Sequence, residues 1–286
     1  MTPVRLSLLF VVALAAAALA LPVPGAQAQT GGSAPGSGPD GDDRPPEANA
    51  CRASRSPRLR CPDLILRMPY GRYLRRSGSR VFLHAGNSIV NLGQGPAEVL
   101  GQRDSTVGPM SVTQRILGVD GRRYEFPSPG ARISFKFIPG QYGYWKFENA
   151  ARFEIWTVDP QGRLGRMVRT GPKLIYCLRD LAKRALLPFA PASRVYPACS
   201  QDPRRRSVTL GTSVGWADEY PPGYYEQYIE LTGLRGRFVF IQRVDPLNGI
   251  RESNEANNLS PRVFLRLPAP GSPGSGSGSA PSPGGY

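Results

Sequence analysis

Residues 51–268 contain a series of short stretches in which apolar and polar residues alternate. In the clearest of them, Phe153 and Ile155 alternate with Arg152 and Glu154, which is the period of a half-buried strand. Turn-forming residues separate the stretches, a pattern typical of an all-β, immunoglobulin-like β-sandwich. The predicted strands are Leu64–Met68, Arg80–Asn91, Ala97–Gln102, Ser111–Val119, Arg132–Phe137, Tyr144–Val158, Ser207–Thr212, Glu226–Thr232, Arg237–Val244 and Arg262–Leu267.

The segment Asp180–Leu187 has helical spacing instead. Its apolar residues Leu181 and Leu186 lie on either side of Lys183 and Arg184. This spacing predicts one short helix inside the otherwise all-β domain.

The first 28 residues have the three parts of an export signal. Arg5 provides the basic start, Leu6–Leu21 is apolar, and Ala26 and Ala28 form a small-x-small cleavage site. An apolar run of about sixteen residues is short for a membrane span. We predict that residues 1–28 are a cleaved signal peptide, which leaves no transmembrane span; an uncleaved anchor is the alternative.

Residues 29–50 and 269–286 consist largely of Gly, Ser, Pro and Asp and show no apolar period. They contain little that could be buried to offset the entropy cost of ordering, so we predict a disordered linker and a disordered tail. The remaining residues, 51–268, are long enough for one domain with a sizeable core.

Four cysteines follow the predicted export signal, which favours disulfide bonds. We favour the pairs Cys51–Cys61 and Cys177–Cys199, because each closes a local loop. A thiolate metal or redox site is the alternative, although no C-x-x-C motif is present.

The stretch YGYWKFENAARFEIW at 142–156 carries the candidate chemistry. In a strand, its side chains at Tyr142, Tyr144 and Lys146 share one face, with roughly 7 Å between neighbours. Such a row of side chains can build a metal site only when its members are metal ligands.

The same stretch resembles the copper-binding strand of bacterial lysyl oxidases, H-x-H-W-H-F-x-x-x-A-R-Y-E-L. The resemblance implies a lysyl oxidase-type β-sandwich in which the copper histidines fall on Tyr142, Tyr144 and Lys146. It also implies that the family's lysine tyrosylquinone cofactor would be built from Lys173 and Tyr220. Further pieces that resemble the family in the same order are Cys61-Pro62-Asp63-Leu64, Asn91–Pro96, Gly211–Tyr220, Gln227–Thr232 and the surroundings of Cys177 and Cys199.

The residues at the three copper positions oppose metal binding. Deprotonation at pH 7 costs roughly 4 kcal/mol for a tyrosine and about 4.6 kcal/mol for a lysine, so about 13 kcal/mol is lost over the three positions. The chain contains one histidine, His84, in a predicted strand, where we interpret it as a packing residue. We therefore expect no copper, and no quinone cofactor, in this protein.

Without copper, Tyr220 should remain an ordinary tyrosine packed under a sheet, and Lys173 should form a hydrogen bond or extend to solvent. Asp218 is then a turn residue. The acidic and amide residues of Asp245–Asn258 are interpreted as a structural turn, with a calcium site as the alternative.

The formal net charge of +15 and the pI of about 10.2 indicate a strongly basic surface. Such a surface attracts anionic cell-envelope polymers or acidic proteins, although an arginine-rich composition without a binding role is an equal alternative. No nucleic-acid-binding motif is present. The basic residues cluster at Arg52–Arg60, Arg72–Arg80, Arg163–Arg169 and Arg204–Arg206.

Two functional hypotheses follow. The first is a secreted or envelope protein of lysyl-oxidase-like fold that has lost its copper site and acts as a non-catalytic binding module. The second is an amine oxidase that deaminates primary amines or peptidyl lysine through a Lys173–Tyr220 quinone. The sequence does not indicate the oligomeric state.

Overall fold

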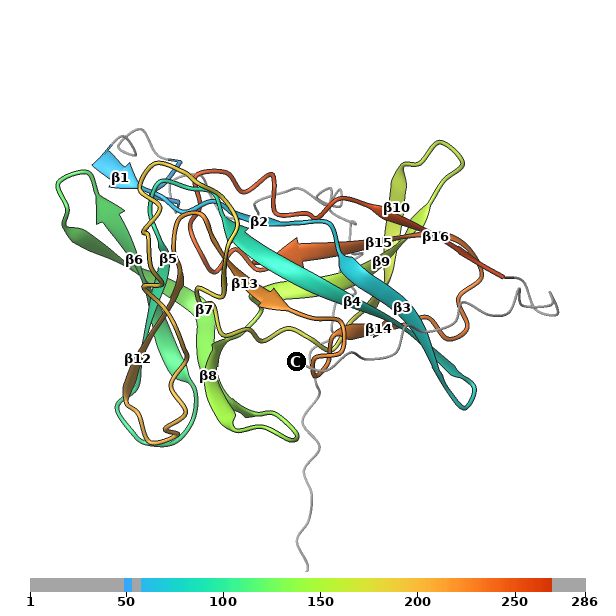
Figure 1. Cartoon of the computed structure of the whole chain (residues 1–286), viewed down its shortest axis with the longest axis horizontal. Helices are drawn as coiled ribbons and strands as arrows, with labels where there is room; N and C mark the ends of the chain where they lie inside the picture. The colour runs from blue at the N-terminus through green and yellow to red at the C-terminus, as the bar shows by residue number, and fades with distance from the viewer. Residues whose placement is uncertain (1–48, 53–57, 269–286) are drawn as a thin grey trace, which may run out of the picture. The chain divides into compact units, whose positions relative to one another are not determined.

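The computed structural model describes residues 49–52 and 58–268, and this part of the chain is all-β, with no α-helix in it (Figure 1). The predicted signal peptide at 1–28, most of the predicted linker at 29–50 and the predicted tail at 269–286 lie outside the described residues. The described part begins at Asn49, whose side chain is fully buried and donates a hydrogen bond to Glu255 at 2.7 Å. The folded domain thus includes Asn49, two residues before the expected boundary.

Within these residues the strands form three antiparallel sheets. The first has the order β12-β5-β6-β7-β8, and β1 pairs with β6 beside this path. Its strands are β1 (Leu59–Arg60), β5 (Ala97–Gln102), β6 (Met110–Gly118), β7 (Arg123–Phe137), β8 (Gly143–Phe147) and β12 (Ser207–Thr212).

The second sheet has the order β10-β9-β15-β16. The third is organised around β4, which pairs with β13 and β14 and also with β2 and β3. The strands of the second sheet are β9 (Ala151–Val158), β10 (Leu164–Thr170), β15 (Gly236–Val244) and β16 (Val263–Leu267). Those of the third are β2 (Leu64–Leu66), β3 (Tyr70–Ser77), β4 (Arg80–Asn91), β11 (Ala182–Lys183), β13 (Trp216–Tyr220) and β14 (Tyr228–Glu230).

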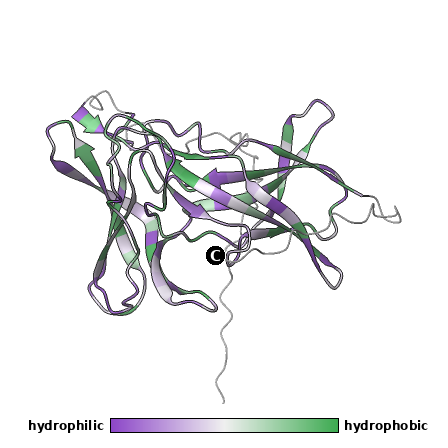
Figure 2. Cartoon of the chain, viewed as in Figure 1, coloured by the Kyte–Doolittle hydropathy of each residue, from purple (hydrophilic) through white to green (hydrophobic). Residues whose placement is uncertain are grey.

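Apolar side chains from different sheets share one core, and hydrophobic and hydrophilic residues alternate along several strands (Figure 2). Trp145 and Phe147 of β8 are almost completely buried in it. Phe147 also forms an isolated bridge with Tyr176, and the backbone hydrogen bonds between them measure 2.8 and 3.0 Å. This bridge draws the segment after β10, which contains Lys173, into the core.

The predicted strand bounds are confirmed for β4, β5 and β12. The long strand predicted at Tyr144–Val158 is two strands, β8 and β9, because the chain turns at Asn149, where φ is 55°. Asparagine tolerates this left-handed conformation better than most residues. The strands β1, β3, β10 and β13 were not predicted.

The predicted helix at Asp180–Leu187 is wrong. Residues 182–183 form β11, which pairs with β13, and the Leu181 N–H donates to the Ala217 carbonyl at 2.9 Å. Leu186, part of the predicted apolar face, is 88% exposed. A helix of two turns has a costly nucleus and needs a buried face to stabilise it, and this segment instead completes its hydrogen bonds on a neighbouring strand.

Both predicted disulfides are present: Cys51 pairs with Cys61, and Cys177 pairs with Cys199. Disulfides are typical of proteins that fold in an oxidising, extracellular environment. In the described part of the chain, no helix has the length and apolar character needed to cross a membrane.

We expect the double variant Cys177→Ser/Cys199→Ser to lose about 3 kcal/mol of unfolding free energy, because the bond closes a loop with a sequence separation of 22. Urea unfolding with and without reductant measures this loss. The Cys51→Ser/Cys61→Ser variant, whose loop has a separation of 10, should lose slightly less. An unchanged midpoint for the first variant would contradict the expectation.

Candidate functional site

The candidate site lies where β8, β13 and the segment between β10 and β11 meet. β8 provides Lys146, β13 provides Asp218 and Tyr220, and the segment provides Lys173. The Nζ atom of Lys173 is 4.5 Å from the centroid of the Tyr220 ring, and the Nζ atom of Lys146 is 5.5 Å from it. The fold therefore brings together both implied quinone positions and one of the implied copper positions.

Tyrosine rings form the walls around the two amines. The Tyr220 ring lies edge-to-face with Tyr176 at 5.1 Å and packs against Tyr224 at 5.0 Å. The Lys173 amine is 4.9 Å from the Tyr176 centroid and 4.8 Å from that of Tyr224. At these distances the ring faces stabilise an ammonium group through cation–π attraction.

Asp218 provides negative charge close to these amines. Its side chain is fully buried, and one carboxylate oxygen accepts a 3.0 Å hydrogen bond from the Leu178 N–H. The other oxygen, Oδ1, has no hydrogen-bond partner among the described residues. Burial raises the pKa of Asp218 to about 6, against the opposing effect of Arg179 and the two lysines. Asp218 is therefore mostly ionised at pH 7.

Burial also shifts the pKa values of the two lysines. It lowers the pKa of Lys173 to about 7, and the positive charge of Lys146 acts in the same direction. It lowers the pKa of Lys146 to about 8, which the charge of Asp218 partly opposes. At neutral pH, Lys173 is therefore about half neutral, while most of Lys146 is protonated.

Tyr220 is held as a protonated phenol. Its hydroxyl oxygen accepts a 3.0 Å hydrogen bond from the Cys177 N–H, and burial raises its pKa well above the ordinary value. The expectation that Tyr220 packs in the interior agrees with its 3% exposure.

Two other expectations about this site are wrong. Asp218 is not a turn residue, because it lies within β13, paired with Ile89 of β4. Lys173 does not extend to solvent, because it is only 1% exposed and its amine lies among tyrosine rings.

The three implied copper positions do not form a single site. Tyr142 precedes β8 and is 73% exposed, whereas Lys146 is buried beside Tyr220. The Tyr144 ring is half-buried, 5.7 Å from the Lys146 amine. Protonated lysine is not a metal ligand, and no His or Cys joins these residues, since the described cysteines are disulfide-bonded and His84 lies on β4. The residues present do not fit a copper ion.

His84 is a packing residue, as predicted. It is 7% exposed, its ring stacks on Tyr73 at 4.7 Å, and its Nδ1 lies 3.2 Å from the Pro222 carbonyl oxygen. It also lines a separate surface pocket with Arg75 and Tyr228.

Sequence reasoning missed Tyr176, Tyr224 and Arg179 as members of the site. Tyr176 was available as the neighbour of a predicted disulfide cysteine. Tyr224 lies four residues after Tyr220, but only the turn after β13 brings its ring back against Tyr220. The local sequence around Arg179 gives no comparable signal.

The structure also brings together Asp245, Glu252 and Glu255, whose carboxylate oxygens lie within 4.8 Å of one another. Asp245 has the predicted turn role, since it accepts hydrogen bonds from the Gly249 and Ile250 N–H groups at 2.8 and 2.7 Å. Burial and the neighbouring carboxylates raise the pKa of Glu252 well above its usual value. Retention of a proton by Glu252 reduces the negative charge of this buried cluster.

No protein-family model matches the sequence, and no curated protein matches it significantly. The resemblance to lysyl oxidases therefore depends on short motifs alone. The chemistry of the site follows from the residues that form it.

Proposed function

We propose that this chain is an exported, lysyl-oxidase-like protein that lacks a copper site and acts as a non-catalytic binding module for an anionic partner. The observation that supports this proposal best is the buried pair Lys146 and Lys173 around Tyr220. The cationic groups Lys146, Lys173 and Arg179 outnumber the one carboxylate of Asp218 that faces them, and this excess of positive charge repels a divalent cation.

Burial changes the energetic argument against copper without reversing it. With a pKa of about 8, Lys146 loses its proton at pH 7 for about 1.4 kcal/mol rather than about 4.6 kcal/mol. Tyr142, however, is exposed, so its hydroxyl group does not provide a second ligand in the interior. Of the three implied copper positions only Lys146 and Tyr144 then remain, fewer donors than Cu(II) requires for tetragonal coordination.

Export and binding are supported by separate features. The two disulfides suit an oxidising compartment. The net charge of +15 gives long-range attraction to polyanions, and the eight residues of β3, which include Arg72, Arg75 and Arg76, are all exposed. The partner class is an anionic cell-envelope polymer or an acidic protein.

We expect the purified mature protein to retain less than about a tenth of an equivalent of copper after reconstitution and to produce no peroxide from primary amines. Elemental analysis and a coupled peroxide assay measure these outcomes. The triple variant Tyr142→His/Tyr144→His/Lys146→His is the matched control, since it restores imidazole ligands at the same positions. Stoichiometric copper with amine-dependent peroxide in the wild-type protein would overturn the proposal.

An amine oxidase with a Lys173–Tyr220 quinone is the second candidate, and one observation favours it. The Lys173 amine lies 4.5 Å from the centroid of the ring to which it would be joined. Peptide mapping of the mature protein separates the two candidates. A cross-linked pair of peptides that disappears in Tyr220→Phe supports the oxidase, and unmodified peptides across both residues count against it.

A further inference from the structure

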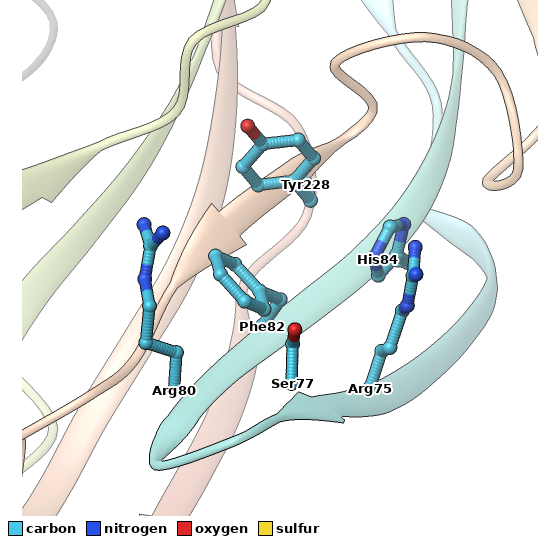
Figure 3. A pocket seen from close by; sticks show the side chains of 6 residues that line it. All are labelled: Arg75, Ser77, Arg80, Phe82, His84 and Tyr228. Carbon is cyan, nitrogen blue, oxygen red and sulfur yellow. The ribbon is translucent and has the colours of Figure 1, made fainter.

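A separate pocket lies on the third sheet, between the β3–β4 hairpin and β14 (Figure 3). Its volume is about 200 Å³, and it is open to solvent. This is below the range of roughly 300–1,000 Å³ that is usual for drug-sized ligands, so the pocket suits a single ring. The lining residues are Arg75, Ser77, Arg80, Phe82, His84 and Tyr228.

The two arginines of the pocket differ in their charge balance. Arg80 forms a bidentate pair with Glu230, with N–O distances of 3.1 and 2.7 Å, and its charge is therefore largely neutralised. The Arg75 side chain makes no hydrogen bond or ion pair with any residue in the described ranges. The pocket thus has one uncompensated guanidinium group, which matches a ligand with one negative charge.

The other walls are flat rings. Phe82 and Tyr228 pack edge-to-face, with centroids 5.3 Å apart, and His84 lies 5.5 Å from Tyr228. In Figure 3 the Arg75 guanidinium lies beside the His84 ring. Burial lowers the pKa of His84, and the charge of Arg75 acts in the same direction while the hydrogen bond with the Pro222 carbonyl opposes it, so a second positive charge in the pocket is disfavoured.

We propose that this pocket binds one carboxylated sugar unit of an acidic polysaccharide. The planar guanidinium of Arg75 pairs with the two oxygens of a carboxylate, and Ser77 is available to the sugar hydroxyl groups. The apolar face of the sugar ring packs on Tyr228, because the Arg80 guanidinium already covers the Phe82 ring at 4.8 Å. This inference builds on the proposed function, because it names the chemical class of the anionic partner.

Size and charge distinguish this ligand from other anions. A phosphate dianion would need a second uncompensated cation, and Arg80 is already paired with Glu230. An aspartate or glutamate side chain of an acidic protein would reach Arg75 but has no ring to cover the aromatic walls. An open pocket also allows a polymer chain to continue on both sides of the bound unit.

The test is calorimetric titration of the purified mature protein with tetragalacturonate, its methyl ester and tetraglutamate. We expect saturable binding of tetragalacturonate, and a loss of about tenfold or more in Arg75→Gln because a charge-assisted bidentate hydrogen bond is removed. Arg75→Lys keeps the charge without the planar fork, so its affinity should be intermediate. The Arg75 side chain is exposed and has no polar partner among the described residues, so these variants should fold normally.

Arg204→Gln is the charge-matched control, since its side chain is 87% exposed and it precedes β12 in another sheet. Its affinity should stay within about twofold of the wild type. The proposal that the pocket binds a carboxylated sugar would be overturned by an equal loss of affinity in Arg75→Gln and Arg204→Gln. Equal affinity for tetragalacturonate and its methyl ester would also overturn it. Binding of tetraglutamate with the same dependence on Arg75 would overturn the assignment to a sugar.

These outcomes are distinct from failure of the proposed function. If the protein binds stoichiometric copper and oxidises amines while Arg75-dependent binding of the sugar persists, the proposed non-catalytic role is wrong but the proposed sugar-binding pocket is supported. If substitution of Arg75 does not change the affinity for tetragalacturonate and the protein still binds no copper, the proposed sugar-binding pocket is wrong but the proposed non-catalytic role is supported.

Discussion

Replacing Lys173 with methionine should stabilise the protein by about 4 kcal/mol at pH 7, because the variant no longer has to bury an amine that the unfolded chain protonates. The pKa of Lys173 falls from its ordinary value of 10.5 to about 7 on folding. The unfolded chain therefore binds more protons between about pH 7 and 10.5, and the Lys173 contribution to stability rises with pH across this window.

The stability difference between Lys173→Met and the wild type should accordingly shrink to about 1 kcal/mol near pH 10. Urea unfolding of both proteins at several pH values measures it. Lys183→Met is the matched control, because Lys183 is exposed on β11 and the variant makes the same side-chain exchange without removing a buried amine. A pH-independent difference for Lys173→Met would contradict the burial argument.

Asp218→Asn should stabilise the protein by about 3 kcal/mol at pH 7. Burial raises the pKa of Asp218 from 3.8 to about 6 although Arg179 and the two lysines oppose this shift, so the ionised carboxylate is less stable in the fold than in the unfolded chain. Asparagine keeps an oxygen that can accept the hydrogen bond from the Leu178 N–H. The gain is therefore electrostatic in origin, and it should shrink as the pH falls from 7 toward 4, because the carboxyl group of the folded wild type takes up a proton near its pKa of about 6.

A double-variant cycle tests this assignment. In the background of Lys173→Met, Asp218→Asn should stabilise the protein by at least about 1 kcal/mol more than in the wild type, because one of the cations that attract the carboxylate is gone. Asp104→Asn, at an exposed turn, controls for the loss of one carboxylate and should have little effect. Additive effects of Asp218→Asn and Lys173→Met would contradict a shared electrostatic cluster.

The strands that sequence analysis predicted best have an apolar face or an apolar run bounded by turn residues, as in β4, β5 and β12. β3 was missed because its side chains are exposed throughout, so no burial pattern marks it. β13, with the sequence WADEY, was missed for the opposite reason: it buries Asp218 together with Trp216 and Tyr220, and the charged residues hide the strand.

The candidate site was partly predictable. The resemblance implied that Lys173 and Tyr220 are neighbours, and their proximity agrees with that prediction. The charge of Asp218 and the buried position of Lys146 depend on strand register and on how the segment after β10 packs. Such long-range packing has no local signature in the sequence, which is also why the helix predicted at Asp180–Leu187 proved to be a strand partner of β13.

The exposed strand β3 also bears on self-association. It pairs with β4 alone among the described strands, so its outer backbone groups are available to another chain. The positive charges of Arg72, Arg75 and Arg76 repel a second copy approaching along this edge. A polyanion that neutralises these side chains, or salt that screens them, would remove this protection, so the strand that we propose attracts an anionic partner also limits aggregation.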